Sequence, residues 1–151
     1  MTNVYDIIDT LKQQGEASPF INTVTVGDIT QVDLDKQSIF PLFHITLDTA
    51  EVSDNMVEFN VKLLVADLVD YSTSDDNDSS YENEHTEHIL NTQLQSIIGI
   101  VTGFTKGAQR DLGLQVDDNY TCTPFVERFE NVLAGWESEI TIKTPNTFSN
   151  C

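Results

Sequence analysis

The chain has 151 residues, of which 39% are hydrophobic and 21% are charged, values typical of a single globular domain that buries its own core. Its 25 acidic residues outnumber its 7 basic residues and give a formal net charge of −18. This balance argues against a domain that binds nucleic acid or anionic lipid, because both ligands are recognised through Lys and Arg. An acidic surface instead favours solubility, repulsion of nucleic acid or attraction of a basic partner.

Neither a membrane span nor a targeting segment is expected. No apolar run approaches the roughly 20 residues needed to cross a bilayer, and the first residues, MTNVYDIIDTLKQQGE, lack the basic start and apolar centre of a signal peptide. The two cysteines, Cys122 and Cys151, are too few for a disulfide framework. We therefore expect free thiols and assembly in the cytoplasm.

The first half of the chain predicts one helix and three strands. Val4 to Gln14 carries apolar residues at helical spacing, with Ile7 and Leu11 on the apolar face. Runs that alternate between apolar and polar residues predict three strands: Phe20–Val26, Leu42–Leu47 and Met56–Val69. A turn at 53–55 joins the last two as an antiparallel hairpin, and a change of the apolar side near 63–64 predicts a bulge or a bend.

The second half predicts a loop, a long helix and a second hairpin. Residues 70–81, DYSTSDDNDSSY, contain no aliphatic side chain and predict a flexible acidic loop. The longest helix is predicted over Asn83–Gly107, and its apolar stripe comprises Leu90, Leu94, Ile97, Val101 and Phe104, with Ile98 beside them. Two strands, Tyr120–Arg128 and Trp136–Lys143, then form a hairpin, and residues 145–151 form a loose tail.

This order of elements predicts a single α+β domain over residues 1–151. A mostly antiparallel sheet is expected to pack against the central long helix, with an N-terminal helix and a C-terminal β-hairpin completing the fold. The apolar stripe of the central helix would supply much of the core.

A second stripe on the central helix consists only of small residues: Thr92, Ser96, Gly99, Gly103 and Gly107. Glycine inside a helix costs roughly 1 kcal/mol relative to alanine. The stripe therefore predicts either a second packing surface, such as a contact with another copy of the chain, or a helix that breaks near Gly103. Candidate subunit contacts on this stripe and on the first helix are Thr92, Ser96, Gly99, Gly103, Ile7 and Leu11.

Acidic residues cluster in and just after the predicted loop, and the candidate interaction residues are Asp75, Asp76, Asp78, Glu82 and Glu84. Carboxylates attract cations, but the stretch DDNDSSYENE lacks the central glycine of an EF-hand loop. We expect weak, non-specific cation binding or capture of a basic protein, and no specific metal site.

No residue pattern predicts a catalytic reaction or a cofactor. His85 and His88 are three residues apart, whereas zinc proteases place two histidines four apart with glutamate directly after the first. The glycines of GIVTGFTKG lack the Gly-Lys-Ser/Thr ending of a phosphate-binding loop. His44 lies in a predicted strand and is interpreted as a structural histidine. The chain is therefore not expected to be an enzyme.

Two stretches resemble small virion proteins of tailed bacteriophages, which occur around the neck and the head-proximal end of the tail. The first runs from Gly27 to Ile45, GDITQVDLDKQSIFPLFHI. The second is Val132–Trp136, VLAGW, followed by an alternating strand and a terminal cysteine. The order of helix, strands, helix and final hairpin is also similar to the tail terminator fold.

The resemblance implies a homo-oligomeric ring, six-fold rather than twelve-fold, that ends polymerisation of the tail tube and joins the tail to the neck. Its implied partners are copies of itself, the tail tube and neck or connector proteins, with no membrane. It implies a place in the virion, after assembly in the host cytoplasm. Acidic residues facing the channel would repel genomic DNA, which would pass without specific binding.

Two other interpretations stay open. A dodecameric neck or head-completion adaptor ring belongs to the same class. An acidic protein-binding module, including a DNA-mimic inhibitor, belongs to a different class. Native stoichiometry separates the two rings, and deletion of Asp75–Ser80 separates a ring former from a binding module.

Overall fold

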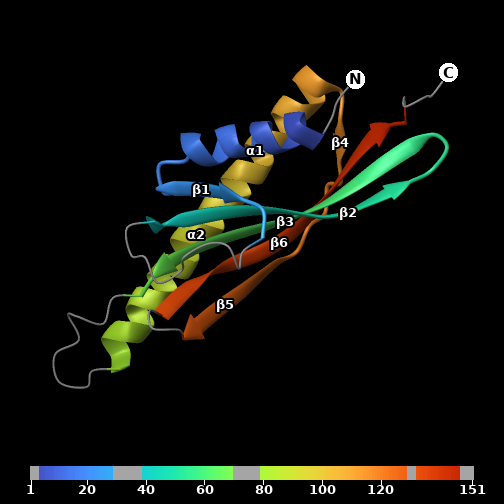
Figure 1. Cartoon of the computed structure of the whole chain (residues 1–151). Helices are drawn as coiled ribbons and strands as arrows, with labels where there is room; N and C mark the ends of the chain where they lie inside the picture. Colours follow the sequence, from blue (N-terminus) through green and yellow to red (C-terminus); the bar gives the residue numbers. More distant parts are fainter. Residues whose placement is uncertain (1–3, 29–38, 70–78, 129–131, 147–151) are drawn as a thin grey trace.

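The computed structural model of the chain describes residues 4–28, 39–69, 79–128 and 132–146. The elements, in chain order, are α1 Val4–Ala17, β1 Thr23–Val26, β2 Leu42–Val52, β3 Met56–Leu68, α2 Ser79–Gly107, the π-helical turn η4 Ala108–Leu112, β4 Gln115–Val116, β5 Cys122–Arg128 and β6 Val132–Pro145 (Figure 1). Two helices and a mostly antiparallel sheet confirm the predicted α+β class, including its central helix and C-terminal hairpin.

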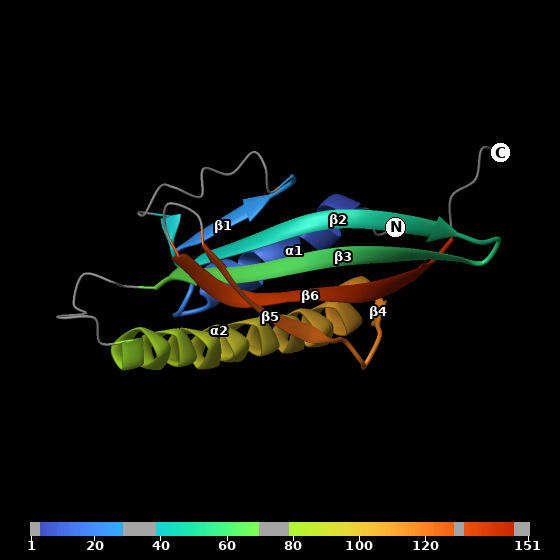
Figure 2. The same ribbon diagram turned by 90° about the horizontal axis from the view of Figure 1, so that it is seen from below.

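The six strands form one sheet in the order β1-β2-β3-β6-β4, and β5 also pairs with β6. β1 runs parallel to β2, whereas the other pairs are antiparallel. The predicted hairpins, β2–β3 and β5–β6, are joined by the β3–β6 pair, which is continuous from Met56↔Pro145 to Leu68↔Leu133. Both helices lie on the same face of this sheet (Figures 1 and 2).

The main core lies between the helices and this face. Ile7 and Leu11 of α1 are at most 1% exposed. They belong to one buried cluster with side chains from the sheet and from α2, including Phe43, Ile45, Val61, Leu63, Val65, Ile97, Phe104, Ile140 and Ile142. The indole N–H of Trp136 donates a hydrogen bond to the carbonyl oxygen of Leu90 (2.7 Å) and ties α2 to β6.

Burial along α2 follows the predicted stripe most closely in its second half. Three of the predicted apolar residues are buried (Ile97, Val101 and Phe104), and two are half-buried (Leu90 and Leu94). Ile98 is instead 45% exposed, and Ile100 is buried at 2% exposure. The predicted apolar stripe therefore packs into the core, whereas Ile98 beside it faces solvent.

α2 does not break at Gly103 but continues to Gly107 and then into η4. A Cβ atom at Gly103 would collide with the side-chain amide of Gln14 in α1. The small residue therefore leaves room for the end of the Gln14 side chain between the two helices. At this position the second packing surface is formed within the chain, by α1.

The predicted bulge near 63–64 is wrong. β3 pairs with β6 without interruption through this region, and the register shift lies in β2, between Leu47 and Thr49. The apolar side changes along β3 because apolar side chains occupy both faces of the strand there. Leu63 belongs to the core beneath the helices, and Leu64 packs in a smaller cluster on the opposite face.

Several predicted boundaries also differ from the structure. β1 begins at Thr23 rather than Phe20, β2 runs to Val52 rather than Leu47, and β6 begins at Val132 rather than Trp136. α2 begins at Ser79, so residues 79–81 of the predicted loop are helical, while residues 70–78 lie outside the described ranges. β6 extends to Pro145, and the N–H of Asn146 donates to the carbonyl oxygen of Asn55 (3.0 Å). The start of the predicted loose tail is thus held by hydrogen bonding, and residues 147–151 lie outside the described ranges.

Candidate functional site on the open face of the sheet

The face of the sheet that points away from the helices carries side chains in cross-strand rows. Residues paired across neighbouring strands share a face. From the base of the β2–β3 hairpin toward its tip the rows are Leu42–Ala66–Gly135–Phe125, His44–Leu64–Glu137–Thr123, Thr46–Lys62–Glu139 and Thr49–Asn60–Thr141. The face therefore changes from apolar through charged to uncharged polar along the hairpin, and the next row toward the tip, Glu51–Glu58–Lys143, is charged again.

The apolar row belongs to a second, smaller core. Its buried members are Phe40, Leu42, Ala66 and Leu133. At Gly135 an added Cβ atom would collide with the backbone carbonyl oxygen of Val65. The glycine of the VLAGW stretch is therefore needed for close approach of β6 to β3.

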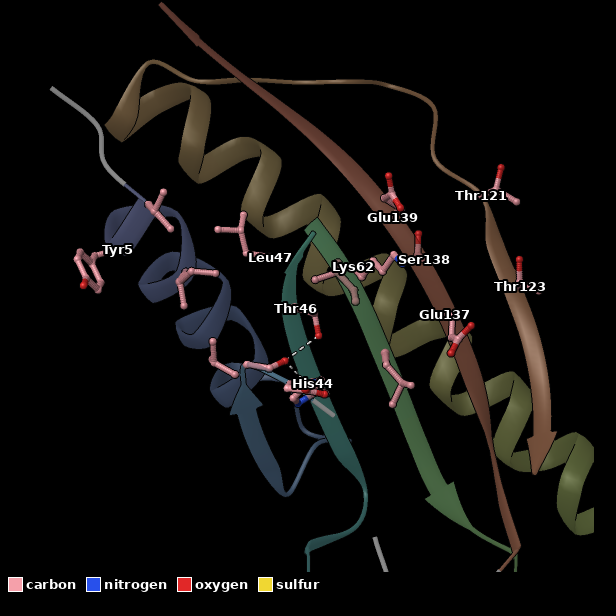
Figure 3. Close-up of a pocket in the computed structure, with 17 residues that line it drawn as sticks. Tyr5, His44, Thr46, Leu47, Lys62, Thr121, Thr123, Glu137, Ser138 and Glu139 are labelled. Carbon is pink, nitrogen blue, oxygen red and sulfur yellow. Dashed lines mark hydrogen bonds between the residues drawn. The ribbon is translucent and has the colours of Figure 1, made fainter. Parts of the chain in front are cut away.

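A groove with a volume of about 950 Å³ covers the second and third rows (Figure 3). Its lining extends from Tyr5 in α1 to Thr123 in β5 and to Thr121, just before that strand. The groove thus begins beside α1, crosses β2, β3 and β6, and ends at the outer strand β5. It is a broad, open surface across the sheet.

His44 lies at the wall of this groove but is only 2% exposed. Its Nε2–H donates to the carbonyl oxygen of Gly27 (2.8 Å), so Nδ1 accepts a hydrogen bond from the hydroxyl of Thr25 (2.6 Å). Burial lowers the pKa of His44 below its ordinary value of 6.5, although the bond to Gly27 and the charge of Asp28 oppose this shift. These contacts hold a neutral histidine between β1 and β2, in agreement with the structural role predicted for it.

Glu137 and Glu139 give the groove a negative floor, and both are exposed. Among the residues that line it, Lys62 is the only lysine or arginine, and its ammonium group lies 3.8 Å from the carboxylate of Asp48. Exposed ion pairs of this kind are weak and salt-sensitive. The groove therefore favours a basic or polar partner over an anion.

Gly27 determines where β1 leaves the sheet. Its φ of 115° is a conformation that favours glycine. Its carbonyl oxygen accepts hydrogen bonds from His44 and from the hydroxyl of Thr46 (2.9 Å), both on the open face. The chain therefore turns over the open face after β1, whose last paired residue lies opposite Ile45. Within the described ranges, β2 has a neighbouring strand on one side only from Thr46 onward.

Beyond this point the β2–β3 hairpin forms an exposed arm, which we define as residues 47–55. Every residue of the arm is exposed, with Leu47 at 41% and Val52 at 71%. Figure 2 shows the arm extending past β1 and α1. Its tip is closed by Ser53, whose N–H and hydroxyl both donate to the carbonyl oxygen of Met56 (2.8 and 2.9 Å).

The six candidate subunit contacts fall into two groups. Ile7, Leu11 and Ser96 are at most 3% exposed within the chain, so they offer no surface to another subunit. Gly99 is exposed, whereas Thr92 and Gly103 are half-buried. Since Gly103 faces Gln14 of the same chain, the accessible candidates on α2 are Thr92 and Gly99.

The candidate acidic interaction residues are only partly placed. Asp75, Asp76 and Asp78 lie outside the described ranges, and Glu82 and Glu84 lie in the first turns of α2, with side chains outside the described part. Among the other predicted candidates, His88 is exposed on α2, and Cys122 is a free, half-buried thiol in β5. In the part of the chain that the structure describes, no group of three or more His, Cys, Asp or Glu residues is arranged to hold a metal ion.

Sequence reasoning missed both the groove and the free edge of β2. The alternation along β3 and β6 was a usable signal, because it places Lys62 and Leu64 on one side of β3 and Glu137 and Glu139 on one side of β6. No local pattern shows that these two strands lie side by side, since α2 separates them along the chain.

A comparison of the sequence with protein-family models found no match, and a comparison with curated proteins also found none. Within the described residues, no helix has an apolar stretch that would cross a bilayer.

Proposed function

We propose that the chain is a structural protein of a tailed-phage virion that forms a ring at the head-proximal end of the tail. In this role it ends polymerisation of the tail tube and joins the tail to the neck. The observation that carries the proposal is the resemblance of Gly27–Ile45 and Val132–Trp136 to small neck and tail proteins. The order of elements adds support, since a tail terminator fold is expected to have the same order.

The structure gives these two stretches physical roles that suit a rigid subunit. Gly27 turns the chain away from β2, and Gly135 allows β6 to approach β3 closely. The net charge of −18 also supports a channel protein, because acidic residues facing the lumen repel DNA phosphates and let the genome slide.

The test is polymerisation of purified tail tube protein with and without the chain. We expect the chain to bind tube ends and to stop their growth, which electron microscopy would show as short tubes capped by a ring. Tubes of unchanged length, with the chain absent from their ends, would contradict the proposal. Twelve copies at each end instead of six would favour the neck adaptor.

The acidic binding module is the second candidate, and the negative floor of the groove favours it. Deleting residues 75–80 distinguishes the two functions. A ring former should still assemble after the deletion, whereas a module that captures basic proteins through this segment should lose its partner while staying folded.

A further inference from the structure

We propose that the outer edge of β2, from Thr46 to Val52, binds an extended segment of a partner protein in which basic and apolar residues alternate. The segment would pair with β2 as an additional strand of the sheet. This inference goes beyond the ring proposal and does not depend on it, because it is argued from the edge alone.

Among the described residues, no strand pairs with the outer side of this edge. The N–H of Ser53 donates across the hairpin to Met56 (2.8 Å), so Ser53 directs its backbone groups toward β3. Successive residues of an antiparallel strand direct these groups to alternate sides. Those of Val52 and Ala50 therefore point to the free side. Such a row of unpaired donors and acceptors is the surface on which β-strand addition occurs.

One side of an added strand would meet apolar side chains. Leu47, Ala50 and Val52 pair with residues of β3 that face the helices, so they lie on the helix side of β2. All three are exposed, and the arm that carries them extends past α1 (Figure 2). Tyr5, at 79% exposure, lies in the groove lining together with Leu47. Apolar residues at alternate positions of the partner would cover these side chains.

The other side of an added strand would meet acidic side chains. Glu51 lies directly opposite Glu58 on the open face, and like charges in this position are destabilising. Lys143 lies 3.8 Å from Glu58, but no cation is within ion-pair distance of Glu51 among the described residues. The arm, LDTAEVSDN, contains three acids and no Lys or Arg, and of these acids Asp48 already has Lys62 at 3.8 Å. A basic residue of the partner beside Glu51 would relieve this repulsion.

The same features disfavour a second copy of the chain as the occupant. Pairing two copies of this edge would bring the acidic side chains of both copies, Asp48 and Glu51, together. Charge complementarity therefore assigns the edge to a basic segment.

The probe is a fluorescent peptide of about eight residues in which lysine and valine alternate, long enough to span the edge at roughly 3.3 Å per residue. A matched peptide with glutamate in place of lysine is the control. We expect the full chain to bind only the lysine peptide, measured by fluorescence anisotropy at low salt. The amide resonances that shift should be those of residues 46–52.

Two variants test the position of the peptide. Ala50→Pro removes an outward N–H at an exposed position and should weaken binding about tenfold, since a lost hydrogen bond and a steric block act together. Glu51→Lys should weaken binding about fivefold and improve binding of the glutamate peptide. Glu87→Lys, on the exposed surface of α2, makes the same change in net charge and should leave the affinity nearly unchanged.

If Glu51→Lys and Glu87→Lys weakened binding of the lysine peptide to the same extent, only net charge would matter. That result would overturn the assignment. Failure of the lysine peptide to bind, or full binding by Ala50→Pro, would also overturn it. Self-association that Ala50→Pro abolishes would assign the edge to a second copy instead. A ring that persists in Ala50→Pro while the peptide no longer binds would support the assignment and keep the two proposals separate.

Discussion

The two halves of β2 both carry large apolar side chains, but in opposite surroundings. Leu42–Ile45 lies between β1 and β3, and its side chains are at most 2% exposed. Leu47–Val52 has only β3 beside it in the described structure, and all of its residues are exposed. Leu47 and Val52 are as apolar as Ile45, so neighbours rather than hydrophobicity decide their burial. The comparison separates the part of the strand that stabilises the fold from the part available to a partner.

The largest expected effect comes from truncating matched side chains in the two halves. Ile45→Ala should lower the free energy of unfolding by about 2–5 kcal/mol, because it opens a cavity in a fully buried site. Leu47→Ala removes an isomeric side chain at 41% exposure and should cost less than about 1 kcal/mol. Urea unfolding of both variants measures the difference, and equal losses would show that the arm is as constrained as the base.

The second prediction concerns glycine at the base of the sheet and glycine on the outer surface. Gly135→Ala should lower the free energy of unfolding by about 3 kcal/mol, because its Cβ atom would collide with the backbone of β3. Gly99→Ala should raise it by about 0.5–1 kcal/mol, since the site has no neighbour within 4 Å and alanine favours the helix. Thermal unfolding should therefore shift in opposite directions in the two variants. A tolerated alanine at 135 would contradict the close approach of β6 to β3.

The smallest effect is a pH dependence in the inner half of β2. Burial lowers the pKa of His44 in the folded chain, so on acidification the unfolded chain binds this proton first. Stability contributed by neutral His44 should therefore be present above pH 6.5 and should decline as the pH falls below that value. Unfolding of the wild type and of His44→Gln across this range isolates the contribution. The stability difference between them should shrink on acidification, and a constant difference would contradict a buried neutral histidine.

Local periodicity predicted most elements of the fold but not their environment. The strands around Leu42 and Met56 and the long helix were predictable because their apolar spacings are strong. Exposure of Ile98 and the continuation of α2 past Gly103 were not predictable, since both depend on where α1 packs. The supposed bulge at 63–64 shows the same limit, because a strand covered on both faces resembles a strand that changes phase.

The candidate site was less predictable than the fold. Its rows depend on the pairing of β3 with β6, two strands separated by the whole of α2. The free edge of β2 depends on the turn at Gly27, whose carbonyl contacts His44 and Thr46 only after the sheet has formed. Neither feature is encoded in a short run of residues. The acidic charge was visible in the composition, but its position beside an unpaired edge was not.

The mass of the native assembly tests the central claim most directly. Light scattering after size exclusion, over a range of concentrations and with purified tail tube present, reports the number of 16.9 kDa chains in each particle. The ring proposal predicts a particle of six chains, and twelve would favour the adaptor ring. A monomer at the highest concentration that stays a monomer with tail tube present would contradict the proposal.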